Sequence, residues 1–334
     1  MERQTPSIVT RPFVFLSRWR SLPLYEIISY FFMYASIPML AYGIQSYDFE
    51  IIKLIVFVII TLYSGFFAAL IWNDITDADI DAIAHNDRPI PSGIISRKKF
   101  FVVALFFSAL TFIFAFLISI WCLFIVGASA LFVTFHNKYL KKSVKLPAYS
   151  EIFTPLQWIV VPLFGFMAIW TVLPQSSEIY TSFLFFGNIS TSYSAIQQMI
   201  VFLIFTYFAD NAHDLPEGIH DIEGDRKLGV KTYANSFGEK NAAIISITMF
   251  SISGILGLLL YFISVLSEIF LILFIFLWLH TFRYYYKLIK ANQKEMKEFG
   301  KIVGRKGFDY FLFCFLFIFI DILIQLLVFN FQII

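Results

Sequence analysis

Charged residues are scarce in this 334-residue chain. Asp, Glu, Lys and Arg together make up 14% of the residues, whereas 59% are hydrophobic and the mean hydropathy is +0.77. A soluble domain of this length would need far more polar surface, so the composition excludes the soluble globular class and predicts a polytopic membrane protein. The net charge is only +2, and we expect no nucleic-acid partner.

Cysteine is also nearly absent. The two cysteines, Cys122 and Cys314, lie inside separate apolar runs, and neither has a second cysteine nearby in the sequence. This excludes a disulfide framework and a cysteine-based metal site, so we expect both to be small core residues. A cleavable signal peptide is not expected either, because the first apolar run begins near Leu22 and is too long for the apolar core of a signal.

Long apolar runs dominate the sequence and predict its fold class. Nine runs are long enough, or nearly so, to cross a membrane as helices: residues 23–43, 50–72, 99–118, 119–136, 151–173, 194–213, 241–263, 266–286 and 308–332. A single helix over 99–136 would be about 57 Å long, so we predict a tight turn near Ser119–Trp121. The prediction is an all-α integral membrane protein, with about nine transmembrane helices in a bundle around a central cavity. We expect residues 174–193 to form an interfacial loop or short helix.

The basic residues give an independent check of this topology. With nine spans, the N-terminus and the connections after spans 2, 4, 6 and 8 lie on one side of the membrane. All of the 25 Lys and Arg except Lys53 fall on these segments. By the positive-inside rule this side is cytoplasmic, or its organellar equivalent. The basic arm of residues 1–22 is expected to form a short amphipathic helix on the membrane surface.

Four carboxylates lie within the nine residues from Asn73 to Asp81, at the inner end of the second run. Asp74, Asp77 and Asp81 are spaced i, i+3 and i+7, so a helix that continued through them would place them on one face. Like charges this close repel one another, and the edge of a membrane raises the cost. A hard divalent cation would offset this repulsion, and Mg²⁺ prefers such oxygen ligands.

The sixth run ends in a second acidic cluster. Asp214, Asp221 and Asp225 are spaced i, i+7 and i+11, again on one helical face, although Pro216 and Gly218 are expected to interrupt that helix. Two acidic clusters at the inner ends of even-numbered spans indicate two facing halves of a bundle, with a Mg²⁺-bridged pyrophosphate between them. The sequence match between the halves is too weak to establish a duplication.

Other ionisable residues receive no role from the sequence. Asp210, Asp214 and Glu217 lie upstream of Asp221 in the same acidic run, and the nearby histidines have no spacing typical of a metal site. Asp321 lies inside the last apolar run, where an unpaired charge is costly. It could pair with a neighbouring helix, be neutral, or line a cavity.

Both acidic segments resemble signatures of the UbiA superfamily of intramembrane prenyltransferases. The first is Asn73-Asp74-x-x-Asp77-x-x-x-Asp81, followed by Asp87-Arg-Pro-Ile-Pro-Ser-Gly93. The second is Asp221-Ile-Glu-Gly-Asp225-Arg-Lys-Leu-Gly-Val-Lys-Thr232. The nine-span topology, with both motifs on the cytoplasmic side, is also similar to that family. The resemblance therefore covers nearly the whole chain, as a single domain over 1–334, and departs from the family's pattern only where Pro216 and Gly218 are inserted.

The resemblance implies a Mg²⁺-dependent enzyme that moves an isoprenyl group from a polyprenyl diphosphate to a lipophilic acceptor and releases pyrophosphate. The implied metal ligands are Asn73, Asp74, Asp77, Asp81, Asp221 and Asp225, and the implied catalytic residues are Asp74, Asp77, Asp221 and Asp225. The implied diphosphate-binding residues are Asn73, Arg88, Lys141 and Lys142. Arg88 suits this role because the prolines at 89 and 91 stiffen its turn and a guanidinium binds phosphate oxygens bidentately.

Two alternative functions stay open beside prenyl transfer. A UbiA-like membrane terpene cyclase would use the same residues and quench the allylic cation within its own chain. A transporter is less expected, because transporters place ionisable residues near the middle of the membrane and these lie at one face. The segment 223–229 resembles the chlorophyll-synthase and archaeal ether-lipid branches, which points away from quinone precursors. We expect contacts with membrane lipid and no protein partner.

Overall fold

A computed structural model describes residues 24–84, 88–140, 143–173 and 178–333. The basic arm (1–22), Asp87 and the two predicted phosphate-binding residues Lys141 and Lys142 lie outside the described residues. The described chain is helical apart from its connections and one hairpin. This confirms the all-α integral membrane class.

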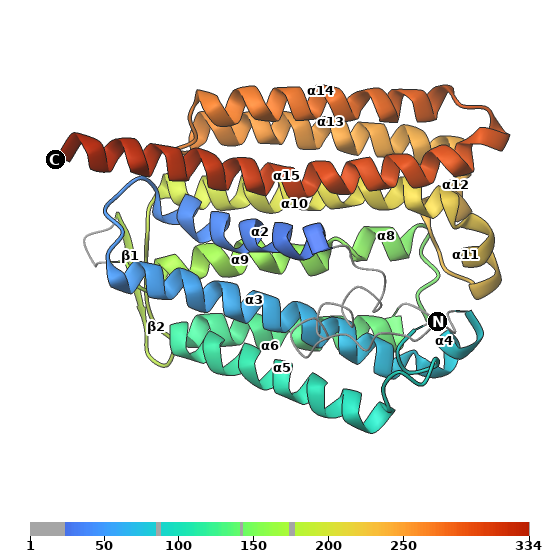
Figure 1. The fold of residues 1–334 in the computed structure, drawn as a ribbon, viewed down its shortest axis with the longest axis horizontal. Coiled ribbons are helices and arrows are strands. Elements are labelled where there is room, and N and C mark those ends of the chain that lie inside the picture. The colour runs from blue at the N-terminus through green and yellow to red at the C-terminus, as the bar shows by residue number, and fades with distance from the viewer. Residues whose placement is uncertain (1–23, 85–87, 141–142, 174–177, 334) are drawn as a thin grey trace, which may run out of the picture.

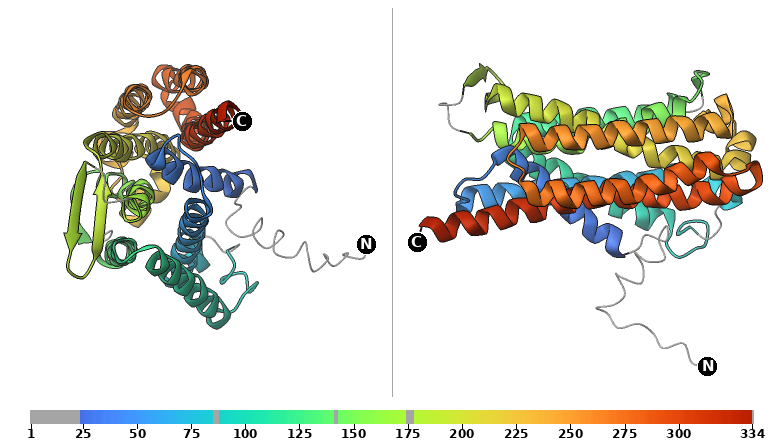
Figure 2. Two further views of the ribbon diagram at one scale, coloured as in Figure 1. Left: turned by 90° about the vertical axis from the view of Figure 1, so that its left-hand side faces the viewer. Right: turned by 90° about the horizontal axis from the view of Figure 1, so that it is seen from above.

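The long helices run side by side along the long axis of the molecule (Figures 1 and 2). They are α2 (Leu24–Tyr42), α3 (Phe49–Thr76), α5 (Arg97–Ile118), α6 (Ile120–Phe135), α9 (Leu156–Trp170), α10 (Tyr193–His220), α13 (Glu239–Ile263), α14 (Glu268–Lys290) and α15 (Gln293–Ile333). Four short helices lie at one end of the bundle, which we call the inner end (Figure 1): α4 (Ala78–Ala84), α8 (Tyr149–Phe153), α11 (Ile222–Leu228) and α12 (Tyr233–Phe237). A π-helical turn, η1 (His136–Leu140), extends α6 at this same end.

Eight helices of the described chain are long and apolar enough to cross a membrane. Helix α10 is not among these eight, although it has 28 residues and lies beside α15 in Figure 1. Its inner half carries Asp210, His213 and Asp214, which lower its apolar character. The count of nine spans therefore remains a prediction. The central cavity also remains a prediction, and a cavity among the described residues lies at the outer end of the bundle, beside Tyr42 and Asp48.

The predicted turn between spans 3 and 4 is confirmed. Ser119 adopts an extended conformation (φ −167°, ψ 162°) between α5 and α6 and ends the first helix. Its hydroxyl accepts a hydrogen bond of 3.1 Å from the Cys122 N–H and so caps the second helix. A serine cap satisfies one of the first four N–H groups of a helix, which have no partner within it.

The outer connection is a hairpin, so the expectation of a loop or short helix over 174–193 was wrong. Strands β1 (Ile179–Phe183) and β2 (Gly187–Thr191) pair antiparallel, with Ile179 opposite Thr191 and Phe183 opposite Gly187. Their Ile, Tyr and Thr residues favour strands, and Gly187 takes the left-handed φ of 81° that ends the turn. The ring of Trp121, at the start of α6, lies 5.0 Å from the ring of Phe183 and anchors the hairpin.

Helix α10 continues through Pro216 and Gly218 to His220, so the expected interruption was also wrong. Proline has no N–H, which leaves the Ala212 carbonyl four residues earlier without its helical donor. The Ser246 hydroxyl of α13 donates to this carbonyl at 2.8 Å, and the Tyr285 hydroxyl of α14 donates to it at 3.0 Å. Two side chains on neighbouring helices therefore replace the hydrogen bond that proline removes.

Helix α15 approaches the inner half of α10 closely because it carries glycines there. A Cβ at Gly300 would lie 2.6 Å from the Pro216 carbonyl oxygen, and one at Gly304 would lie 2.3 Å from Cγ of Glu217. Small residues allow helix backbones in a membrane protein to pack at short range. The glycines of α15 thus fix the depth at which α10 sits in the bundle.

Asp321 is fully buried in α15 and caps the N-terminus of α14. Its carboxylate accepts hydrogen bonds from the N–H groups of Ser267 (2.9 Å) and Phe270 (3.2 Å) and from the Ser267 hydroxyl. The Gln325 amide donates to it at 2.8 Å. A negative charge is stabilised by the exposed N–H groups and the dipole of a helix N-terminus. Of the alternatives for Asp321, the structure therefore shows pairing with a neighbouring helix.

We predict that Asp321→Ala destabilises the protein by about 2–3 kcal/mol, because two N–H donors then lose their acceptor inside the bundle. Thermal unfolding of the purified protein in detergent measures this. Glu268→Ala is the matched control, because Glu268 is an exposed acid in the first turn of α14, the helix that Asp321 caps. Its loss is expected to cost less than about 0.5 kcal/mol. Equal melting temperatures for the two variants would contradict the capping role.

Candidate functional site

The two acidic motifs have the same backbone geometry. In each, a 28-residue helix (α3 or α10) is joined by one aspartate to a seven-residue helix (α4 or α11). The joining residues, Asp77 (φ −94°, ψ 4°) and Asp221 (φ −89°, ψ 5°), have nearly identical conformations. Each donates its N–H over 2.9 Å to the carbonyl four residues earlier, on Asn73 and Glu217. The motifs are therefore structural equivalents, although their sequences match weakly.

Asp74, Asp77 and Asp81 would share one face only if the helix continued through them, and it does not, because α3 ends at Thr76. Two of the last carbonyls of α3 accept hydrogen bonds from side chains. The Thr76 hydroxyl donates to the Asn73 carbonyl at 3.0 Å, and the Arg97 guanidinium donates to the Ile75 carbonyl at 3.1 Å. The Arg97 bond satisfies a carbonyl that the end of a helix leaves without a helical partner, whereas the Thr76 hydroxyl is a second donor to a carbonyl that already accepts from the Asp77 N–H.

Arg88 draws the carboxylates of the first motif together. Its Nη1 lies 2.7 and 2.6 Å from the two carboxylate oxygens of Asp81 and 3.8 Å from a carboxylate oxygen of Asp74. Asp74 and Asp81 are both buried, whereas Asp77 is half-buried. A buried carboxylate needs such a partner to offset its lost hydration. The structure therefore brings two predicted site residues, Asp74 and Asp81, together around the guanidinium of a third, Arg88.

A compact turn positions Arg88. The Ser92 N–H and hydroxyl both donate to the Arg88 carbonyl, at 2.9 and 2.6 Å. The Gly93 N–H donates to the Ile90 carbonyl at 3.1 Å, and Gly93 has the left-handed φ of 73° that this turn requires. The rigid turn expected from the prolines is present, and it aims Arg88 at the acidic residues of its own motif.

The second motif is more exposed than the first. Asp221 has 68% of its side chain exposed, and Asp225 is half-buried in α11. Gly229 ends α11 in a left-handed conformation (φ 72°). Glu223, between the two aspartates, forms an ion pair with Lys297 of α15, and this ammonium holds the pKa of Glu223 below its ordinary value. The inner end of α15 therefore contacts α11 through this exposed ion pair.

A further carboxylate, which the sequence analysis missed, lies against the second motif. Glu151 of α8 is buried, and one of its oxygens accepts a hydrogen bond from the Tyr233 N–H at the start of α12. Its other oxygen, Oε1, occupies the space beside Gly218. The signal that could have found it is a glutamate at the very start of the fifth apolar run, where a charge is costly.

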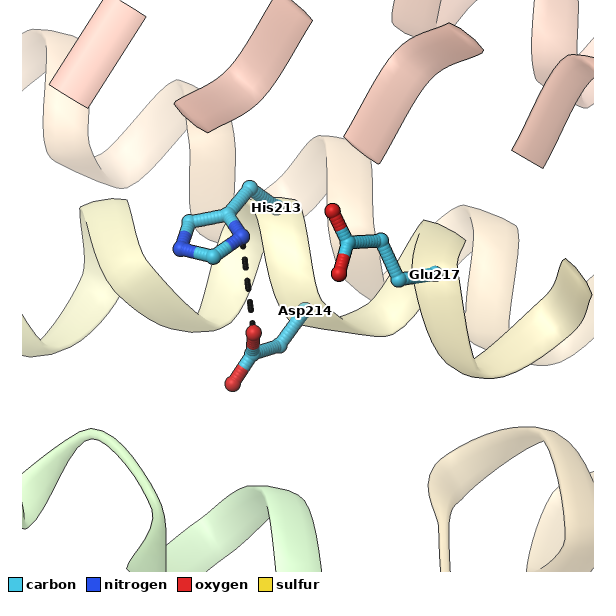
Figure 3. A group of neighbouring side chains, drawn as sticks. All are labelled: His213, Asp214 and Glu217. Atoms are coloured by element: carbon cyan, nitrogen blue, oxygen red, sulfur yellow. Dashed lines mark ion pairs between the residues drawn. The ribbon is translucent and has the colours of Figure 1, made fainter. Parts of the chain in front are cut away.

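A third acidic group lies on α10 one to two turns before Asp221 (Figure 3). The His213 imidazole lies between two carboxylates, with Nε2 3.0 Å from Asp210 and Nδ1 3.4 Å from Asp214. Ligand atoms of His213, Asp214 and Glu217 all lie within 4.8 Å of one another. This group joins two acids that the sequence left without a role, and their i, i+1, i+4 spacing is the signal that could have indicated it.

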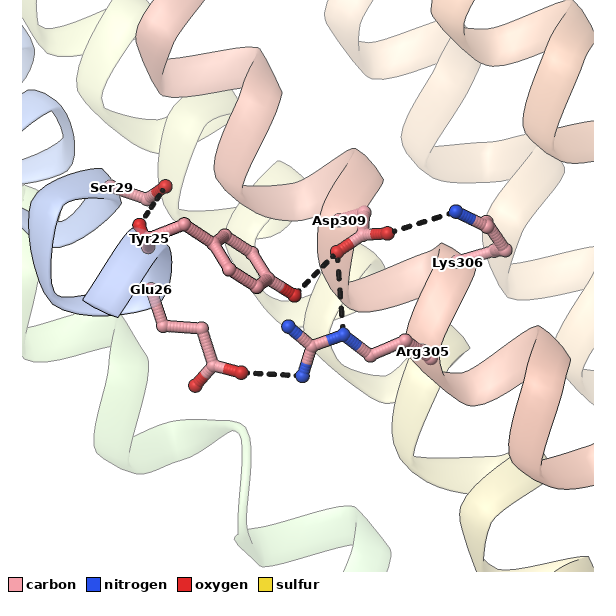
Figure 4. A network of polar contacts seen from close by, with 6 residues as sticks. All are labelled: Tyr25, Glu26, Ser29, Arg305, Lys306 and Asp309. Atoms are coloured by element: carbon pink, nitrogen blue, oxygen red, sulfur yellow. Dashed lines mark hydrogen bonds and ion pairs between the residues drawn. The ribbon is translucent and has the colours of Figure 1, made fainter. Parts of the chain in front are cut away.

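An ion-pair network fastens α2 to α15 at the same end of the bundle (Figure 4). Arg305 pairs with the buried Glu26 and lies 3.5 Å from Asp309, which also accepts from the Tyr25 hydroxyl at 3.2 Å and pairs with Lys306 at 3.2 Å. The first and last helices of the described chain are thus tied together beside the α10 acids. No local sequence signal predicts this pairing, because its partners lie 279 residues apart.

The helices that carry the two motifs end together at the inner end of the bundle, where both views place α4 and α11 (Figures 1 and 2). Oxygen donors predominate there, with amide, carboxylate and backbone carbonyl groups from both halves. Such a donor set suits a hard divalent cation. The arrangement can hold a cation, and through it a phosphate-bearing ligand, at the edge of the membrane.

The model of the UbiA prenyltransferase family matches residues 22–302. Among curated relatives, the digeranylgeranylglyceryl phosphate synthase of Pyrococcus horikoshii is 27% identical over 215 residues, which are 64% of this chain and 66% of that protein. The synthase of Methanosarcina mazei is 28% identical over 213 residues, or 64% of each chain. The matched part therefore spans slightly less than two thirds of these relatives.

Solved structures share the fold. A UbiA homologue from Aeropyrum pernix superposes with a TM-score of 0.63 at 16% identity, covering 91% of this chain and 99% of that one. A UbiA homologue from Archaeoglobus fulgidus bound to GPP and Mg²⁺ superposes with a TM-score of 0.52 at 14% identity, covering 88% of this chain and 98% of that one.

We predict an energetic coupling of about 1–3 kcal/mol between Arg88 and Asp81, because removing either partner leaves the other buried or half-buried without its charge complement. The variants Arg88→Gln, Asp81→Asn and their combination form a double-mutant cycle, read out by thermal unfolding in detergent. The exposed pair Glu50–Lys53 supplies the control cycle, with a coupling below about 0.5 kcal/mol. Simple additivity at Arg88 and Asp81 would show that their contact contributes nothing to the fold.

Proposed function

Because the chain belongs to the UbiA prenyltransferase family, we propose that it moves an isoprenyl group from a polyprenyl diphosphate to a lipophilic acceptor and releases pyrophosphate. The observation that carries this proposal is the matched pair of acidic motifs at the inner end of the bundle. Each presents carboxylates from a joining aspartate and a seven-residue helix, so the two can bind opposite sides of one diphosphate. Residues 1–334 act as one domain in this proposal.

The residues at the two motifs fit Mg²⁺. Asn73, Asp74 and Asp77 would hold it on the α3 side, and Asp221 and Asp225 on the α10 side, through oxygen atoms alone. Once bound, such ions neutralise the charge that builds on a leaving pyrophosphate. The half-buried Asp77 and the exposed Asp221 can reach a ligand, whereas Asp74 lies deeper.

Arg88 and its partners would complete the diphosphate site. The guanidinium has five N–H donors, and Asp81 and Asp74 engage its Nη1, so the remaining donors can serve phosphate oxygens. In this proposal Asp81 orients Arg88 in addition to its predicted part in metal binding. The predicted roles of Lys141 and Lys142 also belong to the proposal, since η1 ends immediately before them at Leu140.

The active site is proposed to face the cytoplasm. The inner end of the bundle carries Arg97, Lys297 and Arg305, in agreement with the distribution of basic residues along the sequence. A diphosphate donor would then enter from the aqueous side, and its isoprenyl tail would extend among the apolar helices. The large aromatic content, with 43 Phe, offers a lining that stabilises an allylic cation.

The acceptor class is proposed from the relatives. The curated relatives named above are digeranylgeranylglyceryl phosphate synthases. A glyceryl phosphate lipid is therefore the first acceptor to test, and its attacking atom would be a hydroxyl oxygen. Formation of the new carbon–oxygen bond would replace the carbon–oxygen bond to pyrophosphate, and the hydroxyl proton would leave to solvent or to a carboxylate.

The test is pyrophosphate release by the purified protein in detergent, supplied with geranylgeranyl diphosphate, Mg²⁺ and geranylgeranylglyceryl phosphate. We expect Asp74→Asn and Asp221→Asn each to lower the rate by about 10²–10³, because each removes charge that compensates the leaving group. Asp79→Asn is the matched control, since Asp79 is an exposed acid of α4 outside the predicted site, and its rate should stay within about twofold of the parent.

Three results would overturn or redirect the proposal. Release at the parental rate by both Asp74→Asn and Asp221→Asn would exclude the two motifs as the catalytic site. Release without any acceptor, with a cyclic hydrocarbon as the product, would identify a terpene cyclase. If the parent releases no pyrophosphate with any diphosphate and acceptor tried, the proposed activity is wrong, although the family membership still holds.

A further inference from the structure

The equivalence of the two motifs exposes a missing carboxylate in the second one. If Asp77 corresponds to Asp221, then Asp81 corresponds to Asp225 and Asn73 to Glu217. Asp74 then corresponds to Gly218, which has no side chain. The first motif has a buried carboxylate at this place on the last turn of its long helix, and the second motif has none of its own.

Glu151 fills the space that this glycine leaves. A Cβ placed on Gly218 would lie 2.2 Å from Oε1 of Glu151, so the carboxylate of α8 lies where a side chain of residue 218 would begin. The burial of the two carboxylates is also alike, with 5% of Glu151 and 2% of Asp74 exposed. A carboxylate delivered from another helix therefore occupies the position equivalent to Asp74.

The backbone around Glu151 holds it in this position. Ala148, just before α8, has a left-handed conformation (φ 57°), which costs a non-glycine residue about 1 kcal/mol or more. Its N–H donates to the Ser236 hydroxyl at 2.9 Å, and the Ser150 N–H donates to the Lys231 carbonyl at 3.1 Å. Strain of this kind persists only where surrounding contacts compensate for it. The segment that follows the second motif supplies those contacts.

Oε1 of Glu151 has no hydrogen-bond partner within the described part of the chain. Among the described residues, the charged neighbours that act on this carboxylate are two further acids, Asp214 and Asp225. A buried carboxylate among other carboxylates either takes up a proton or requires a cation to compensate its charge. A divalent cation held by the second motif would supply this compensation, and its oxygen preference matches the donor set.

We propose that Glu151 supplies, from α8, the carboxylate that α10 lacks at Gly218, and that it is a ligand of the divalent cation bound by Asp221 and Asp225. The second cation site is thus assembled from two separate segments of the chain, whereas the first lies on one. That this cation is Mg²⁺ and lies beneath a diphosphate rests on the proposed function. That Glu151, Asp221 and Asp225 bind the same cation can be tested without any diphosphate.

The first test measures Mn²⁺ binding to the purified full-length protein in detergent by electron paramagnetic resonance, without any diphosphate. Glu151→Gln keeps the size of the side chain and the acceptor for the Tyr233 N–H but removes the charge. We expect the affinity of one class of Mn²⁺ sites to fall at least about tenfold. Glu223→Gln, which removes an exposed charge paired with Lys297, is the matched control and should retain the parental affinity.

The second test moves the carboxylate back to α10. Glu151→Gly combined with Gly218→Asp places an acid at the position equivalent to Asp74, and we expect Mn²⁺ affinity to return to within about threefold of the parent. Glu151→Gly combined with Gly218→Asn has nearly the same volume and no charge, and should stay weak. Thermal unfolding and size-exclusion profiles identify which variants are folded.

The outcomes separate this inference from the proposed function. Parental Mn²⁺ affinity in Glu151→Gln would overturn the inference, and so would equal affinities in the folded Asp and Asn double variants. If Mn²⁺ binding depends on Glu151 but no diphosphate is ever cleaved, the ligand role stands and the proposed function fails. If diphosphate cleavage occurs with Glu151→Gln at the parental rate and Mg²⁺ requirement, the function stands and the ligand role fails.

Discussion

A carboxylate buried at the edge of a membrane must meet a positive charge, a hydrogen-bond donor or a cation, and this requirement organises the chain. Asp81 and Asp74 meet Arg88, Glu26 meets Arg305, and Asp321 meets the N-terminus of α14. The contacts of Glu26 and Asp321 join helices that are far apart in the sequence, whereas Arg88 closes its own motif. The scarce charged residues therefore stabilise the association of these segments. Apolar contacts alone would do this weakly, because lipid contacts are as apolar as those between helices.

The two halves meet this requirement in different ways. In the first half the cation is Arg88, supplied by the turn that directly follows the motif. In the second half the buried acid is Glu151, which accepts a hydrogen bond from the Tyr233 N–H. The inner end of α15 extends beyond the predicted span, and its glycines let it pack closely against α10. It also brings Lys297 to the exposed Glu223 of α11.

The sequence predicted the fold class and both acidic motifs, because apolar length and motif spacing are local signals, whereas the side of the membrane remains a prediction from the basic loops. It did not predict that both helices end within their motifs, since helical spacing continues through Asp77 and Asp221 and only side-chain donors such as Thr76 and Arg97 reveal the end. Glu151 and Glu26 could not be placed either, because their partners are tertiary. The hairpin was missed because residues 174–193 are short, mixed in composition and without a clear period.

The hydrogen bonds at Ala212 also set an order for biosynthesis. A ribosome delivers α10 before α13 and α14, so the carbonyl that Pro216 leaves without a helical donor enters the bilayer before its partners exist. Ser246 emerges 34 residues after Ala212, and Tyr285 emerges 73 residues after it. Until then α10 has a weak point directly before the second motif. The hydrogen bonds at Ala212 are therefore complete only after α14 has been synthesised.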